Sequence, residues 1–116
     1  MSQTTLLNLT LQQSATCLLS FEWLDDQGQP IDLTGCTAKM HLRQSFGTAL
    51  LLELSTENDR IVLAGATGII TLQLDPAATA EMTVSAGVYD LLVYSPNGQV
   101  DVVIQGRFVL TLAVTK

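Results

Sequence analysis

The sequence predicts an all-β protein, an antiparallel β-sandwich of about seven or eight strands with one short helix near residues 75–82. Apolar and polar residues alternate over short segments along the whole chain, and clusters of turn-forming residues interrupt them about every ten residues. Residues 88–114 read as two long strands on either side of a turn at Pro96. A chain of 116 residues has the size of one domain, so we expect residues 1–116 to form a single sandwich.

Strands are predicted in the first half of the chain wherever apolar residues alternate with polar ones. These segments are residues 5–11, 17–23, 38–43 and 50–54. Residues 25–30 form a clear turn, because Asp, Gly and Pro favour turns through side-chain hydrogen bonds or their backbone angles. The side chains expected to face the core on the third and fourth strands are Ala38, Met40, Leu42, Leu50, Leu52 and Leu54.

The outward residues of the third strand form a basic stripe of Lys39, His41 and Arg43. If the third and fourth strands pair so that both apolar faces agree, His41 lies opposite Glu53. Glu53 then lies within diagonal reach of Lys39 and Arg43. The stripe therefore has a structural explanation in cross-strand pairing.

The middle of the chain is expected to hold a short strand, a turn, a returning strand and the helix. The short strand begins at Ile61, the turn occupies residues 64–68, and the strand over residues 70–74 returns to the core. Asp75 and Pro76 begin the helix, because Asp accepts hydrogen bonds from the first N–H groups and Pro suits the first helical position. The residues that follow favour extension, so the helix is one short connector.

The C-terminal hairpin has two possible registers, and a shift of one residue between them would invert its faces. In the first register Leu91 lies opposite Ile104, and the ring of Tyr89 covers the bare backbone of Gly106. Apolar side chains then meet apolar ones along the hairpin. This register requires a four-residue loop over residues 96–99.

The second register follows from a three-residue loop over residues 96–98, a type I turn with a bulge. It would set Val93 directly opposite Asp101, an apolar residue against a charged one. The four-residue loop avoids this pairing and does not require the N–H that Pro96 lacks. We therefore expect the four-residue loop.

The expected register leaves apolar side chains on the outward face of the hairpin, where polar residues are usual. Three explanations are open. Another part of the chain could cover these side chains, they could be scattered surface residues, or they could form an interface with a second copy or another partner. The high apolar content, 47% of residues, favours the interface and a homo-oligomer. The candidate interface residues are Leu92, Tyr94, Val103 and Val109.

No cluster of residues predicts catalysis, a cofactor site or a metal site. His41 is the single histidine, and on an exposed strand the pattern gives it no orienting partner and no neighbouring nucleophile. The aspartates of residues 25–32 match no calcium loop, and Cys17 and Cys36 with one distant histidine make no zinc site. We expect two buried thiols rather than a disulfide, no cofactor and no enzyme.

Charge and composition also exclude some partners. Five Lys and Arg against eleven Asp and Glu give a net charge of −6, which opposes binding to nucleic acid and to anionic membranes. No stretch has the ~18 to 20 consecutive apolar residues of a spanning helix, and the N-terminal residues lack the pattern of a signal peptide. We expect a protein made in a cytoplasm that binds neither nucleic acid nor membrane.

Two aromatic residues favour the immunoglobulin-like form of the sandwich. Trp23 on the second strand and Tyr89 at the start of a late strand are core aromatics of the kind that such a fold uses. The inter-sheet disulfide of antibody domains is absent. The immunoglobulin-like form is nevertheless the expected one.

Four turn and core segments carry a resemblance to known proteins. They are residues 28–35 (GQPIDLTG), 38–43 (AKMHLR), 68–72 (GIITL) and 86–91 (AGVYDL). In this order they resemble small bacteriophage and prophage tail-region proteins, and they are similar to the immunoglobulin-like N-terminal domain of phage baseplate upper proteins. The likeness extends over nearly the whole chain and concerns the fold more than any site.

The resemblance implies a non-enzymatic structural or assembly protein of a phage virion, assembled in the bacterial host cytoplasm. A tail or baseplate component would dock a fibre or receptor-binding protein through surfaces of the sandwich, as a homo-oligomer among other phage structural proteins. The alternatives are a capsid-decorating or head-to-tail joining protein and a small acidic host-directed phage inhibitor. The carboxylates are dispersed along the chain, which disfavours an inhibitor that mimics nucleic acid.

Overall fold

Most of the regular structure in residues 4–114, the part of the chain that this computed structural model describes, is β-strand. The strands are β1 (Thr5–Leu6), β2 (Leu9–Gln12), β3 (Cys17–Glu22), β4 (Thr37–Arg43), β5 (Leu50–Ser55), β6 (Ile61–Leu63), β7 (Ile69–Leu74), β8 (Ala86–Tyr94) and β9 (Val100–Thr111). The helical segments are the single 3₁₀ turn η1 (Gly65–Thr67) and the helix α1 (Pro76–Ala80). The carboxylate of Asp75 caps α1 by accepting the N–H of Ala78 at 3.1 Å, which confirms the predicted helix start.

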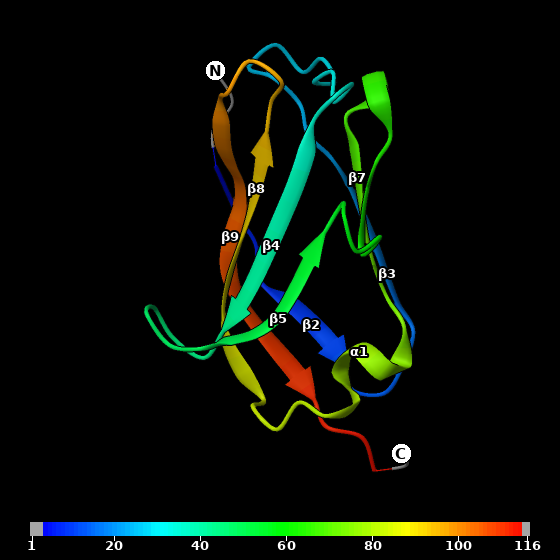
Figure 1. The fold of residues 1–116 in the computed structure, drawn as a ribbon, viewed down its shortest axis with the longest axis vertical. Helices are drawn as coiled ribbons and strands as arrows, with labels where there is room; N and C mark the ends of the chain where they lie inside the picture. The colour runs from blue at the N-terminus through cyan, green and yellow to red at the C-terminus, as the bar shows by residue number, and fades with distance from the viewer. Residues whose placement is uncertain (1–3, 115–116) are drawn as a thin grey trace.

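The strands form two sheets that pack face to face, and the molecule is an immunoglobulin-like β-sandwich (Figure 1). The larger sheet has the order β1-β9-β8-β4-β5, with β2 also paired to β9. The smaller sheet has the order β3-β7-β6. The chain crosses between the sheets after β2, after β3, after β5 and after α1, so each sheet combines strands that are distant in sequence. The predicted all-β sandwich and its immunoglobulin-like form are confirmed.

The predicted first strand is divided into β1 and β2, and both run parallel to the last strand, β9. Leu9 and Leu11 are buried as the alternation predicts, whereas Leu7 and Thr5 are exposed. Alternation identifies a strand but not its partner, so the parallel pairing of the two ends of the chain is not visible in the sequence.

The core lies between the sheets and is built from their inward side chains. Trp23 and Tyr89 are both buried, as expected for core aromatics. Leu50 is an exception to the predicted core, because it is 43% exposed. The register of β4 and β5 shifts by one residue, so Leu50 lies opposite the outward Arg43. The most deeply buried side chains include Met40, Leu42, Leu54, Ile61, Ile70, Leu91 and Phe108.

The β8–β9 hairpin combines the two registers that the sequence allows. In the half far from the turn, Leu91 lies opposite Ile104, as predicted. In the half next to the turn, Val93 lies directly opposite Asp101, so the expected four-residue loop is wrong. The chain turns through residues 96–98, the three-residue alternative.

A β-bulge at Val103 joins the two registers. Leu91 lies opposite Ile104 and Leu92 lies opposite Val102, so Val103 is the extra residue of β9. The side chain of Val103 turns inward. Val103 is 2% exposed and belongs to the core. Its predicted position on the outward face is therefore wrong, because a bulge exchanges the two faces of a strand without any change in local alternation.

Candidate functional site

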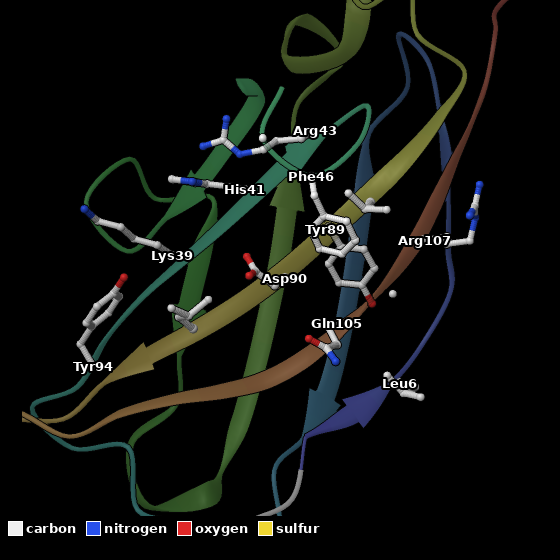
Figure 2. A pocket seen from close by; sticks show the side chains of 14 residues that line it. Leu6, Lys39, His41, Arg43, Phe46, Tyr89, Asp90, Tyr94, Gln105 and Arg107 are labelled. Atoms are coloured by element: carbon white, nitrogen blue, oxygen red, sulfur yellow. The ribbon is translucent and has the colours of Figure 1, made fainter. Parts of the chain in front are cut away.

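The outward surface of the larger sheet is hollowed where β4, β8 and β9 lie side by side, and Figure 2 shows the side chains that line it. The hollow has a volume of about 590 Å³. We call this surface the front face. It consists of the outward side chains of residues 39–43, 88–94 and 105–107, together with Leu6 from β1 and Phe46 from the β4–β5 loop.

Cross-strand pairing arranges the polar side chains of the front face in rows. In the central row, Asp90 lies between His41 on β4 and Gln105 on β9. The next row sets a cation on each side of an apolar residue, in the order Arg43, Val88 and Arg107. These rows come from three strands that adjoin one another only in the folded sheet.

The imidazole of His41 is paired with a carboxylate. Its Nε2 lies 2.7 Å from Oε2 of Glu53, the residue directly opposite on β5. This contact confirms the predicted pairing of β4 with β5, and it corrects the expectation that His41 has no orienting partner. No serine, threonine or cysteine among residues 4–114 lines the hollow, so the pair has no such nucleophile to activate.

Three charged side chains of the front face have no partner within the described chain. Lys39, Asp90 and Arg107 make no side-chain hydrogen bond or ion pair with residues 4–114. Arg43, in contrast, donates from Nη1 to the carbonyl oxygen of Thr48 at 2.6 Å and so ties down the β4–β5 loop. The unpaired charges remain available to a binding partner.

The front face is positive although the chain is acidic. Lys39, Arg43 and Arg107 are three of the five Lys and Arg residues in a chain of net charge −6. Among the described residues, Asp90 is the one carboxylate that lines the hollow. Three cations against one carboxylate give the hollow a charge of +2 with His41 neutral, which leaves −8 for the remainder of the chain.

Apolar side chains complete the front face. Phe46 is 91% exposed and Leu6 is 76% exposed, both at the margin of the hollow. Leu92 and Tyr94 are half-buried and form part of its floor. Aromatic residues and arginine are enriched at protein interfaces, so this mixture of side chains is typical of a binding surface.

The structure brings two of the four candidate interface residues to the hollow. Leu92 and Tyr94 line it, whereas Val109 is exposed farther along β9, opposite Ala86. Val103 is buried, as described above. Local alternation does not indicate that Arg107 lies on the same surface as the cations of β4, because that depends on the strand order β9-β8-β4.

Tyr89 lies beneath the hollow and fixes the N-terminal segment. Its hydroxyl donates to the carbonyl oxygen of Leu7 at 2.6 Å. Burial raises the pKa of Tyr89 to about 12, so the hydroxyl remains a donor over the ordinary pH range. Both cysteines are free, and burial raises the pKa of the Cys17 thiol, which lowers its reactivity.

Two other kinds of site are not found in the described part of the chain. Within residues 4–114, no group of three or more His, Cys, Asp or Glu side chains is arranged to hold a metal ion. The same part of the chain contains no helix with the length and apolar character needed to cross a membrane.

The sequence matches no protein-family profile and no curated protein. Among solved structures, the chain is similar to the extracellular domain of the voltage-gated sodium channel beta4 subunit, whose parallel homodimers are described as explaining its role in cell–cell adhesion. The two are 14% identical with a TM-score of 0.49, over 98% of each chain. A second similar structure, from a study of multimeric cell-adhesive interactions of sodium channel beta subunits, is 16% identical with a TM-score of 0.48. It covers 97% of this chain and 96% of that chain.

These structures correct the resemblance drawn from the sequence. Both are extracellular domains or subunits of sodium channels and neither is a phage tail protein, so the expected membership among phage tail-region and baseplate proteins is wrong. The expectations that rested on this resemblance are therefore also wrong. They are a virion function, phage partners and a location in a virion. At these identities and TM-scores the likeness concerns the fold and carries no function to this chain.

Proposed function

We propose that the protein is a non-enzymatic protein-binding domain that associates with a second copy of itself through the front face. One observation carries the proposal. A single sheet surface combines a hollow, exposed apolar side chains, and charged side chains that have no partner within residues 4–114. Each of these features is common alone. A second protein surface could fill the hollow, bury the apolar side chains and pair with the charges, so their combination indicates a binding surface.

The apolar part of the front face supports association because its burial would be favourable. Phe46 and Leu6 are 91% and 76% exposed. Apolar surface removed from water contributes roughly 25 cal/mol per Å². Burial of these two large side chains by a partner would therefore stabilise a complex, because both are exposed to water in the isolated chain.

The polar part of the front face supports binding rather than catalysis. His41 and Glu53 form a cross-strand pair, and no serine, threonine or cysteine of residues 4–114 lines the hollow beside them. Asp90 is the one carboxylate that lines it among the described residues, so no second carboxylate is placed there for acid–base work with it. The exposed cations instead offer ionic contacts.

Light scattering after size-exclusion chromatography, over a series of concentrations, tests the proposal. The variant Phe46→Ser removes an apolar anchor from the front face without a change of charge. The matched control is Leu24→Ser, because Leu24 is 40% exposed in the turn after β3 and lies outside the hollow.

We expect the wild-type mass to rise above the 12.5 kDa of one chain as the concentration increases. Phe46→Ser should weaken this association roughly tenfold, and Leu24→Ser should leave it unchanged. A wild type that stays monomeric at every concentration, or an equal effect of the two substitutions, would contradict the proposal.

A further inference from the structure

We infer that the association is head-to-tail: the positive front face of one copy docks on an acidic surface of the next copy, and not on another front face. This contact presupposes the self-association proposed above and specifies its geometry. It would give each copy two different binding surfaces.

The charges of the front face oppose a two-fold contact. Such a contact uses the same patch on both copies, so it would bring together two hollows that each carry a charge of +2. Like charges across an interface are costly. Glu53, which lies 2.7 Å from His41 beside the hollow, offsets one of these charges, so each front face still carries a net positive charge.

The remainder of the chain carries −8, and one concave part of it lies on the smaller sheet, the other layer of the sandwich. This second hollow has a volume of about 490 Å³ and lies at the ends of β3 and β7. We call Leu18, Asp59 and Asp75, which line it, the acidic surface. Leu18 is 67% exposed, so the acidic surface offers an apolar side chain close to two carboxylates.

The acidic surface complements the front face in both charge and polarity. Its carboxylates would meet Lys39 and Arg107, which have no partner within residues 4–114, and Leu18 would meet the apolar part of the front face. Arg60 also lines the second hollow, where its Nη1 donates to the carbonyl oxygen of Glu53 at 3.0 Å. Two carboxylates against this one cation leave the second hollow at −1, opposite in sign to the front face.

Both carboxylates can be neutralised without loss of their structural roles. Asp75 caps α1 through Oδ1, and asparagine caps helices equally well. Asp59 has a φ of 64°, in the left-handed region that asparagine tolerates. The double variant Asp59→Asn/Asp75→Asn therefore changes the charge of the acidic surface and preserves its backbone.

A mixing experiment tests the head-to-tail contact. The front-face variant is Lys39→Glu/Arg107→Glu, and the acidic-surface variant is Asp59→Asn/Asp75→Asn. Each variant keeps the surface that the other lacks, so one intact contact remains possible in the mixture. Lys39→Gln/Arg107→Gln replaces the first variant if the reversed charges reduce folding, which circular dichroism would show.

We expect each variant alone to associate roughly tenfold more weakly than the wild type. The equimolar mixture should form a complex of twice the 12.5 kDa monomer mass and no larger species. Wild-type protein should continue beyond two copies at high concentration, because a head-to-tail contact leaves one surface free at each end. Added salt should weaken it, because exposed charges are screened.

The outcomes separate this inference from the proposed function. A monomeric wild type refutes the self-association itself. A wild type that stops at two copies, together with an acidic-surface variant that associates as strongly as the wild type, shows a two-fold contact of the front face and overturns the head-to-tail inference. Variants that associate as strongly as the wild type also overturn it, because the two surfaces are then not in contact.

Discussion

The hydroxyl of Tyr89 donates a hydrogen bond of 2.6 Å to the carbonyl oxygen of Leu7, across the width of β9. Tyr89 lies opposite Gly106, and a Cβ at Gly106 would overlap that same carbonyl oxygen. The bare backbone of Gly106 therefore lets the N-terminal segment approach β9, and the tyrosine holds it there. Leu6, the next residue back along the chain, lines the front face.

Replacing Tyr89 with phenylalanine should lower the free energy of unfolding by about 1 kcal/mol at neutral pH. The substitution removes the donor to Leu7 and keeps the buried ring. Urea unfolding of Tyr89→Phe and of the wild type measures the difference. Equal midpoints and slopes would show that the hydrogen bond contributes nothing to stability.

Alkaline pH should destabilise the protein through the same side chain. Burial raises the pKa of Tyr89 to about 12, whereas an unfolded tyrosine titrates near ~10. Because the folded-state pKa is the higher one, the contribution of the protonated hydroxyl to stability is complete below pH ~10 and is lost as the pH rises toward ~12. Tyr89→Phe should therefore show a shallower decline of stability over this range. Parallel declines in the two proteins would exclude Tyr89 as the cause.

Gly106→Ala should lower the free energy of unfolding by about 2 kcal/mol, because the new methyl group meets a backbone carbonyl that has little room to move. The loss should be concentrated at β1. The N–H of Leu7 donates to the carbonyl oxygen of Gln105 at 3.0 Å, so its hydrogen exchange reports on this contact. Faster exchange at Leu7 is the expected result, and unchanged exchange there would show that the close approach is relieved elsewhere.

Val103→Asp should unfold the protein or lower the free energy of unfolding by more than about 3 kcal/mol, because the carboxylate would enter the core without a partner. Val109→Asp is the matched control. Val109 lies on the same strand and is 50% exposed, so its substitution should change stability by less than about 0.5 kcal/mol. Thermal unfolding of both variants distinguishes the two sites. A stable Val103→Asp would mean that the bulge does not bury this side chain.

The sequence and the structure agree where alternation alone decides the outcome. The inward faces of β4 and β7, the pairing of His41 with Glu53 and the helix start at Asp75 all follow from local pattern. They differ at Leu50 and Val103, where a one-residue shift exchanges the faces of a strand. Alternation reads the same on both sides of such a shift, so the pattern cannot locate it.

The front face depends on information that the local pattern does not contain. Lys39 and Arg43 are visible as an outward stripe, but Arg107 joins them only because β8 lies between β4 and β9. The sequence pattern does predict Leu92 and Tyr94 as interface residues, because outward apolar residues are unusual on a strand. The charge of the surface follows from strand order, so it emerges only from the folded sheet.

Amide chemical shifts of the wild-type protein, followed by NMR as its concentration is raised, test the central claim most directly. We expect the largest changes on the front face, at residues 39–43, 88–94 and 105–107. The head-to-tail contact adds changes around Leu18 and Asp75. Changes that are absent, or that are confined to other surfaces such as β6, would contradict the claim that the front face is where this protein binds.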